Sequence, residues 1–366
     1  MNNIPKATIV LSNRCNLNCS YCFVRQNVVP SLNAGQIKAF IKWFIDLPSD
    51  GDYKKLNFFG GEPFLEFDLL KDAIIFFKKN NTDKKSIIDT IPTNGTILSQ
   101  GILNFVKEEG LRVSFSLDGD RINNMTRTFK DGKTCFDLVW NNLKMFSDFI
   151  GEPPLIKMTI LPSNVKDLYS NVKFLVEHGF YKTWPNPGVF KVKWERADVE
   201  AFTREYKKLL KFYLKRRLSG NPINLVPVDN ILKSALKGEL KENDFFCGLG
   251  EEPILSFDRN IYTCDSVLLE ADDLVGRFKI GEMIGNKINI DFNKMQLFQK
   301  YSIFKDYDLR NKDHFLAHLF RRRPCFALDE NGKLLKNEHI ENILELHLKM
   351  YELSLDLFKK YSHLLK

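Results

Sequence analysis

The sequence predicts an α/β fold, a partial (β/α)6 barrel of the TIM type, followed by a small C-terminal region of β-hairpin and helices that carries cysteines. In the first half, short apolar β-like runs alternate with helical patterns, which predicts a parallel sheet with right-handed crossovers. Polar and glycine-containing motifs fall where four of the predicted strands end. Because ligands of such folds sit at the carboxyl ends of strands, we expect a site at one rim of the barrel.

The individual elements follow from apolar spacing. The predicted strands are short apolar runs that end at turns or motifs: 7–11, 55–59, 87–91, 111–117, 155–161 and 188–194. The predicted helices repeat apolar residues every three to four positions: 35–47, 70–78, 100–109, 136–150 and 165–178. Strand and helix therefore alternate up to about residue 195.

Beyond residue 195 the pattern changes, and we expect four regions in all. These are a barrel over 1–195, a helical linker over 196–246, an auxiliary cysteine region over 247–330 and a C-terminal helix over 331–366. The linker contains an amphipathic helix over 197–218 and a helical turn at 231–236. The last region carries a broad apolar stripe, for which packing onto the core is the expected role.

Composition limits the class of protein. The chain has 366 residues, of which 44% are hydrophobic and 27% charged, and this excludes a disordered chain, a collagen-like chain and a disulfide scaffold. No run of 18 apolar residues and no signal-peptide layout is present, so we expect a cytoplasmic protein with reduced thiols. The net charge of +8 permits an acidic peptide or nucleic-acid partner without requiring one, and solvated faces are the favoured interpretation of the basic triplets 215–217 and 321–323.

Three of the seven cysteines lie close together on the loop after the first predicted strand. Cys15, Cys19 and Cys22 have the spacing CxxxCxxC. Three thiolates can hold three irons of a [4Fe-4S] cluster and leave the fourth iron open for a substrate or cofactor. A structural zinc site wants four ligands in CxxC pairs, and no fourth ligand is adjacent. The cluster is therefore favoured over zinc and over three unrelated thiols.

With an aromatic residue beside the last cysteine, this motif is similar to the signature of the radical S-adenosylmethionine (radical SAM) enzymes, and the resemblance covers about residues 6–195. It implies a [4Fe-4S] cluster on the three cysteines and S-adenosylmethionine chelated to the fourth iron by its methionyl amine and carboxylate. It also implies reductive cleavage to a 5′-deoxyadenosyl radical, which abstracts a hydrogen atom from the substrate.

The same resemblance implies which residues contact S-adenosylmethionine. GGEP at 60–63 matches the motif that contacts the methionyl amine. Ser116, in SLDG at 116–119, and Arg127 match the serine and arginine that hold the ribose or the carboxylate. The aromatic residue of the cysteine loop matches the one that lies near the adenine. The residues so implied are Tyr21, Gly60, Gly61, Glu62, Pro63, Asn94, Ser116 and Arg127, with Asn94 the looser match. Their chemistry agrees: glycines allow close approach of backbone to a ligand, Glu62 can accept from an ammonium group, and Arg127 offers a fork to a carboxylate.

A second cysteine region begins with CGLG at 247–250. Apolar alternation over 254–264 around a turn at 258–260 predicts a β-hairpin with a cysteine at each end, Cys247 and Cys264, and Cys325 follows later. This resembles the auxiliary cluster domain of the SPASM and twitch classes, but the usual turn glycine and the further cysteines are missing. Two complete auxiliary clusters are excluded by counting. One auxiliary [4Fe-4S] cluster on these three cysteines, a vestigial hairpin without a cluster, and zinc stay open, in that order.

Two further residues carry reactive side chains. Asp265 directly follows Cys264, and it matches an aspartate that acts as a base in the anaerobic sulfatase-maturating enzymes. A carboxylate there could accept a proton from a substrate hydroxyl or thiol, although a turn residue or a structural acceptor is the plainer interpretation. Cys135 precedes a predicted helix and is expected to be only a small helix-start residue.

The resemblance of SLDG, Arg127 and the CGxG hairpin to peptide maturases and sulfatase maturases implies an oxidoreductase-type radical enzyme that modifies a side chain or backbone of a peptide or protein, as maturases of ribosomally made peptides do. A small-molecule dehydrogenase or cyclase of the twitch type stays open. A cluster-containing regulator would leave GGEP, SLDG and Arg127 unexplained. Expected partners are a peptide or protein substrate and a reductase electron donor of the flavodoxin or ferredoxin type, without a membrane and without nucleic acid. Because the chain starts almost at the first strand, leader recognition would need a separate partner or the C-terminal region.

Overall fold

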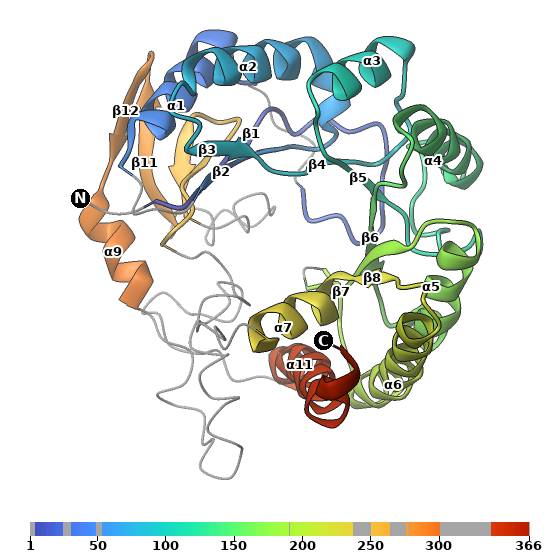
Figure 1. The fold of residues 1–366 in the computed structure, drawn as a ribbon. Coiled ribbons are helices and arrows are strands. Elements are labelled where there is room, and N and C mark those ends of the chain that lie inside the picture. The colour runs from blue at the N-terminus through green and yellow to red at the C-terminus, as the bar shows by residue number, and fades with distance from the viewer. Residues whose placement is uncertain are drawn as a thin grey trace.

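The computed structural model describes residues 4–24, 31–48, 53–189, 191–236, 250–263, 276, 278–300 and 338–365. Its strands form a curved wall, and the helices α1 to α6 follow one another along the outer side of that wall (Figure 1). This is the α/β arrangement that the alternating pattern predicts, and the partial barrel is confirmed.

The wall is built from parallel strands that pair in chain order. They are β1 (Lys6–Val10), β2 (Lys54–Phe59), β3 (Ser86–Ile88), β4 (Ile91–Thr93), β5 (Val113–Ser116), β6 (Leu155–Ile160) and β7 (Lys182–Pro187). β1 pairs with β2 and β2 with β3, while β4 pairs with β5, β5 with β6 and β6 with β7. The run 87–91, predicted as one strand, is thus two strands separated by Asp89 and Thr90. β3 pairs with β2, and β4 pairs with β5.

The outer helices form where the sequence offers an apolar face and a cap. They are α1 (Ala34–Asp46), α2 (Phe67–Asn80), α3 (Gln100–Glu108), α4 (Phe136–Ile150), α5 (Leu168–Glu177) and α6 (Arg196–Leu218), with short 3-10 turns η1 (Pro63–Glu66) and η2 (Val165–Asp167). α1 begins at a capping box between Asn33 and Gln36, which satisfies amides that the first helical turn leaves free. α4 ends at Gly151 with φ of +89°, a conformation that favours glycine.

The two faces of the wall differ in chemistry. Successive side chains of a strand point to opposite faces, and the outer face of β5 is marked by Phe115, whose ring packs 5.2 Å from Phe146 of α4. Phe115 is aligned with Ile156, which is buried, whereas Lys157 and Thr159 on the alternate side are half-buried. The interior of a complete (β/α)8 barrel is filled by branched apolar side chains. Here the inner face of β6 carries an ammonium and a hydroxyl group instead.

The predicted hairpin is present and joins the barrel's own sheet. β9 (Ile254–Leu255) and β10 (Asn260–Tyr262) pair antiparallel across the predicted turn, and β9 also pairs in parallel with β1. A second hairpin of β11 (Lys279–Ile284) and β12 (Lys287–Ile290), followed by α9 (Phe292–Lys300), was not predicted. Its strands contain Gly281, Lys279 and Lys287, residue types that weaken the strand pattern. Cys247, Cys264, Asp265 and Cys325 lie outside the described residues.

The predicted sixth strand at 188–194 is wrong, because the strand is β7, six residues earlier. Its sequence, KTWPNP, contains Pro185 and Pro187, which argue against a strand. The Gly188 amide donates to Ile160 O at 2.8 Å. Because successive backbone amides of a strand point in opposite directions, the amide positions of the two prolines face away from β6. On that side β8 (Asn224–Leu225) pairs only with Lys182 and Thr183. The missing proline amides therefore cost no ladder hydrogen bond.

The C-terminal helix α11 (Glu338–Leu365) packs against α6, α7 (Val226–Leu236) and β7. Its apolar stripe includes Ile343, Leu346, Met350 and Leu355, all buried, which confirms the predicted packing role. In the described part of the chain, no helix is long and apolar enough to cross a bilayer.

Candidate functional site

The loop after β1 carries Cys15, Cys19 and Cys22 as half-buried free thiols at the carboxyl-end rim. The segment between β5 and α4 holds this loop through backbone hydrogen bonds. The Asn18 amide donates to Thr128 O at 2.8 Å, and the Ser20 amide donates to Thr126 O at 3.0 Å. The cysteine loop is therefore fixed by protein backbone on its outer side.

On its other side the cysteine loop lies against the glycines of GGEP. The Gly61 amide donates to Ser12 O at 3.0 Å, and the Glu62 amide donates to Arg14 O at 2.8 Å. A Cβ atom on Gly61 would lie 2.2 Å from Arg14 O, and one on Gly60 would lie 2.6 Å from Ser12 O. The glycines were expected to let backbone approach a ligand. The approach that the structure shows is between this backbone and the backbone of the cysteine loop.

Glu62 joins the ends of β2 and β4. Its side chain is buried, and its carboxylate accepts from the Phe64 amide at 3.0 Å, from Thr93 Oγ1 at 2.8 Å and from the Asn94 amide at 2.6 Å. Burial raises the pKa of Glu62 to about 7, although these hydrogen bonds oppose the shift. A carboxylate has about four acceptor positions, so this one can accept a further donor such as an ammonium group.

Asn94, the looser sequence match, contacts the first cysteine. Its Nδ2 lies 3.6 Å from Cys15 Sγ and donates to Asn16 Oδ1 at 2.9 Å. The Leu17 amide also points at Cys15 Sγ, at 3.5 Å. Donors aimed at a sulfur stabilise a thiolate, and hydrogen bonds to the sulfurs are one of the means by which proteins tune iron–sulfur clusters.

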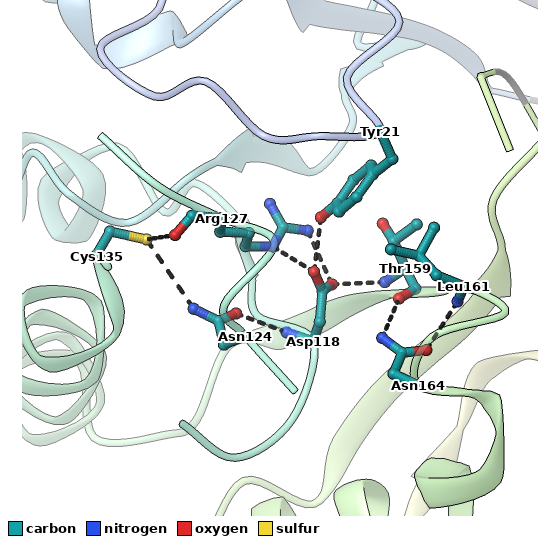
Figure 2. A network of polar contacts seen from close by, with 8 residues as sticks. All are labelled: Tyr21, Asp118, Asn124, Arg127, Cys135, Thr159, Leu161 and Asn164. Atoms are coloured by element: carbon teal, nitrogen blue, oxygen red, sulfur yellow. Dashed lines mark hydrogen bonds and ion pairs between the residues drawn. The ribbon is translucent and has the colours of Figure 1, made fainter. Parts of the chain in front are cut away.

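A buried aspartate, Asp118, connects Tyr21 and Arg127 (Figure 2). The Tyr21 hydroxyl donates to its Oδ2 at 2.7 Å, while Arg127 binds both carboxylate oxygens, through Nε at 2.8 Å and Nη2 at 2.9 Å. The Thr159 amide at the end of β6 donates to Oδ1 at 2.7 Å. Asp118 and Arg127 are 1% and 7% exposed, so this is a buried bidentate ion pair.

The Asp118 contacts bring three parts of the rim together. They join the cysteine loop through Tyr21, the segment after β5 through Arg127, and the end of β6 through Thr159. Arg127 Cζ also lies 5.3 Å from the centroid of the Tyr21 ring, within the range of a cation–π contact. Burial raises the pKa of Tyr21 well above its ordinary value, so its phenol stays protonated and remains a donor.

Sequence reasoning did not single out Asp118, although it lies inside the SLDG motif at 116–119. The fork of Arg127, expected to face a cofactor carboxylate, is occupied here by this aspartate on two of its donors. Cys135 is buried, lies at the N-cap of α4 and donates through Sγ to Arg127 O at 3.3 Å, as Figure 2 shows. Its position agrees with the small helix-start residue that was expected.

The other predicted contacts lie at the same rim. Ser116 is the last residue of β5, and Pro63 is the first residue of η1. All predicted cofactor contacts therefore come from the carboxyl ends of β1, β2, β4 and β5 or from the loops that follow them. The two carboxyl-end residues that sequence reasoning missed are Asp118 and Thr159.

The donor set fits an iron–sulfur cluster better than a single ion. In the part of the chain that the structure describes, no three Cys, His, Asp or Glu side chains are arranged to hold one metal ion. A cluster instead takes one thiolate per iron and so spreads its ligands more widely. Burial raises the pKa of Cys19 to about 12 and also raises the pKa of Cys15. Such thiols stay neutral until a metal displaces their protons.

Comparisons with known proteins agree with this geometry. Residues 9–175 match the radical SAM superfamily. An uncharacterized protein of Methanocaldococcus jannaschii is 29% identical over 169 residues, which are 46% of this chain and 57% of that protein. The cysteine-type anaerobic sulfatase-maturating enzyme of Clostridium novyi is 26% identical over 293 residues, 74% of each chain.

Solved structures share the fold over nearly the whole chain. Native anSMEcpe with bound AdoMet and Cp18Cys peptide superposes with a TM-score of 0.78 at 20% identity, covering 97% of this chain and 99% of that one. Streptococcus suis SuiB bound to its precursor peptide SuiA gives a TM-score of 0.56 at 15% identity, covering 87% and 71%. With the rim geometry, the match over residues 9–175 shows that the chain contains a domain of the radical SAM superfamily, whose enzymes use a [4Fe-4S] cluster and S-adenosylmethionine, while the solved structures show the shared fold.

Proposed function

We propose that this radical SAM enzyme modifies a peptide or protein substrate, as a maturase does. The observation that carries the proposal is the length of the similarity. The match to the Clostridium novyi sulfatase-maturating enzyme takes in 74% of the chain, whereas the radical SAM domain alone takes in less than half. The similarity to a protein-modifying relative therefore extends beyond the domain that all radical SAM enzymes share.

The chain's own residues take distinct parts in this proposal. Cys15, Cys19 and Cys22 hold the cluster, while the Asn94 and Leu17 donors stabilise the first thiolate. Contacts to S-adenosylmethionine come from the rim residues Tyr21, Gly60, Gly61, Glu62, Pro63, Asn94, Ser116 and Arg127. Glu62 offers its remaining acceptor position to the methionyl ammonium group. When bound, the cluster and S-adenosylmethionine supply a 5′-deoxyadenosyl radical able to take a hydrogen atom from carbon.

The C-terminal residues complete the proposal. Cys247, Cys264 and Cys325 hold one auxiliary [4Fe-4S] cluster, and Asp265 accepts a proton from the substrate. The hairpin β9–β10 pairs with β1, the strand that leads into the cysteine loop. This pairing makes the hairpin part of the barrel's sheet, and it is the reason for preferring an auxiliary cluster over a vestigial hairpin. A flavodoxin or ferredoxin supplies the electron.

Iron counting tests the two clusters. The protein is reconstituted anaerobically as wild type and as the triple variant Cys15→Ala, Cys19→Ala, Cys22→Ala. About eight irons in the wild type and about four in the variant support both clusters, whereas about four and none leave the radical cluster alone. Dithionite and S-adenosylmethionine should yield 5′-deoxyadenosine only in the wild type.

Substrate class is tested with defined probes. Synthetic peptides centred on cysteine or serine and GTP are each added to the reduced holoenzyme, and products are followed by mass spectrometry. GTP is the small-molecule probe because the GTP 3′,8-cyclase of Desulforamulus reducens is 30% identical over 148 residues, 39% of this chain. Peptide-dependent 5′-deoxyadenosine with a mass change in the peptide supports the proposal. Turnover with GTP and none with any peptide would replace it by a cyclase.

A further inference from the structure

A lysine on the inner face of the barrel lies next to the predicted cofactor contacts. Lys157 of β6 is aligned with Ser116 of β5 on one side and with Trp184 of β7 on the other. Its Nζ lies 5.3 Å from the centroid of the Trp184 ring, whose residue is 37% exposed. These three side chains therefore form a row across three strands, on the face turned away from the outer helices.

Among the described residues, Lys157 has no carboxylate within ion-pair distance. Lys6, which is near enough to disfavour the charged form of Lys157, is itself 2.8 Å from Glu252 and is thereby neutralised. Asp89 is near enough to favour the charged form of Lys157, but its carboxylate binds Arg112 at 3.3 Å. Burial lowers the pKa of Lys157, because the surrounding protein solvates its ammonium poorly.

A half-buried ammonium without an anion is costly, and a protein that keeps one usually has a partner for it. The Trp184 ring offers a flat apolar surface beside the ammonium, suited to the methylene groups of an acidic side chain. The chain's net charge of +8 also favours approach of an acidic molecule. The charge of Lys157, its position on the inner face and the adjacent Trp184 ring therefore favour a ligand with an anionic group on a short apolar stem.

We propose that Lys157 and Trp184 form a subsite for an aspartate or glutamate side chain of the peptide substrate. The proposal rests on the proposed function, since it names a feature of the same substrate. An acidic residue of the peptide binds the Lys157 ammonium, and its methylene groups lie on the Trp184 ring. The row that includes Ser116 places this subsite beside the cofactor contacts, so the acidic residue lies close in sequence to the residue that is modified.

The test selects peptides by binding. The holoenzyme with S-adenosylmethionine is incubated anaerobically with pooled synthetic peptides of random sequence, acetylated and amidated at their ends so that only side chains carry carboxylates. Bound peptides are sequenced by mass spectrometry. The variants are Lys157→Gln, Lys157→Glu and Lys157→Arg. The control is Lys144→Glu, which changes the net charge by the same amount as Lys157→Glu. Lys144 lies on the outer helix α4, with its Nζ 5.2 Å from the centroid of the Trp140 ring.

Acidic residues should be enriched about tenfold over the input pool by the wild type, by Lys157→Arg and by the Lys144→Glu control. This factor corresponds to the free energy of one hydrogen bond to a charged group. Lys157→Gln should lose this enrichment, and Lys157→Glu should enrich Lys and Arg instead. Iron content and melting temperature establish that each variant is folded. If Lys157→Glu does not fold, the comparison of the glutamine and arginine variants decides.

Three kinds of result overturn the subsite, and they differ in what they say about function. Bound peptides without acidic enrichment in the wild type, or with the same enrichment in Lys157→Gln, leave the peptide function intact and exclude this subsite. A wild-type enzyme that cleaves S-adenosylmethionine but binds no peptide above the input excludes both. Enrichment that falls equally in Lys144→Glu would assign the preference to net charge alone and would also exclude the subsite.

Discussion

At the scale of single residues, we expect the Asp118–Arg127 pair to be sensitive to substitution. Both side chains are buried, and Asp118 accepts four hydrogen bonds from three parts of the rim. Asp118→Asn leaves the Arg127 charge buried without its counterion. We expect a loss of about 3–5 kcal/mol in the free energy of unfolding, measured by urea denaturation of the iron-free chain.

The matched control is Asp137→Asn, which breaks the exposed pair with Arg121. Exposed pairs contribute about 0–1 kcal/mol, so this variant should unfold almost like the wild type. An Asp118→Asn protein within about 1 kcal/mol of the wild type would contradict the role assigned to the buried pair.

Glu62 predicts a dependence of stability on pH. Its pKa is raised to about 7 in the folded chain by burial, whereas an unfolded glutamate titrates near 4.5. Between these values the folded state binds more protons, so stability is highest below the lower pKa and falls as the pH rises through about 7. The wild type should lose up to about 3 kcal/mol relative to Glu62→Gln between pH 4.5 and 8.

Urea denaturation of the two iron-free proteins at several pH values measures this difference. The glutamine variant loses one acceptor for the Asn94 amide, but this offset does not depend on pH. Only the change with pH tests the titration. A constant difference across the range would show that Glu62 titrates alike in both states.

Much of the candidate site is encoded in contiguous motifs, so its residues could be proposed from the sequence alone. Cys15, Cys19 and Cys22 share one loop, and Gly60, Gly61 and Glu62 share another. Asp118 was missed because its importance comes from partners at Tyr21 and Thr159, which lie on other loops and strands. A sequence shows which residues are present in a motif but not which of them the fold brings into contact.

At the scale of elements, the contact between the GGEP loop and the cysteine loop is a steric prediction. A Cβ atom at Gly61 would lie 2.2 Å from Arg14 O, and backbone cannot move away as a flexible side chain can. Gly61→Ala should therefore displace the loop that carries Cys15. We expect the reconstituted variant to lose the irons of the radical cluster, about four of about eight per chain.

The control for this glycine is Gly101→Ala in α3. Only Ser99 Oγ comes within 4 Å of its added Cβ, at an ordinary 3.7 Å. Alanine is favoured over glycine in a helix, so this variant should gain up to about 1 kcal/mol and keep all its iron. Full iron in Gly61→Ala would show that the two loops can separate without losing the cluster.

Helices with strong periodicity were predicted to within three residues at each end, and elements set by tertiary pairing were not. α4 occupies 136–150 as predicted, since its apolar spacing and terminal glycine are local signals. β7 was placed six residues too late because Pro185 and Pro187 argue locally against a strand. Only the one-sided pairing of β7, with β8 meeting just its first two residues, makes those prolines acceptable.

At the scale of the whole molecule, the C-terminal helix and the barrel form one packed body in the described structure. α11 contacts α6, α7 and β7, and Asn342 Nδ2 donates to Trp194 O at 3.0 Å. Tyr206 of α6 is hydrogen-bonded to Ser354 of α11, at 3.1 Å between their hydroxyls. The helices expected over 196–246 and 331–366 thus share a core with the barrel, as the apolar stripe of the C-terminal helix predicts.

Because α11 and the barrel share a core, we expect a destabilising substitution in α11 to unfold the barrel as well. Leu346 is fully buried, so Leu346→Ala should cost about 2–5 kcal/mol. Because the helix and barrel share buried side chains, tryptophan fluorescence and far-ultraviolet circular dichroism should show one transition at a lower urea concentration. The exposed substitution Glu341→Ala on the same helix should leave the midpoint unchanged. Two separate transitions in Leu346→Ala would mean that α11 unfolds from a barrel that is stable without it.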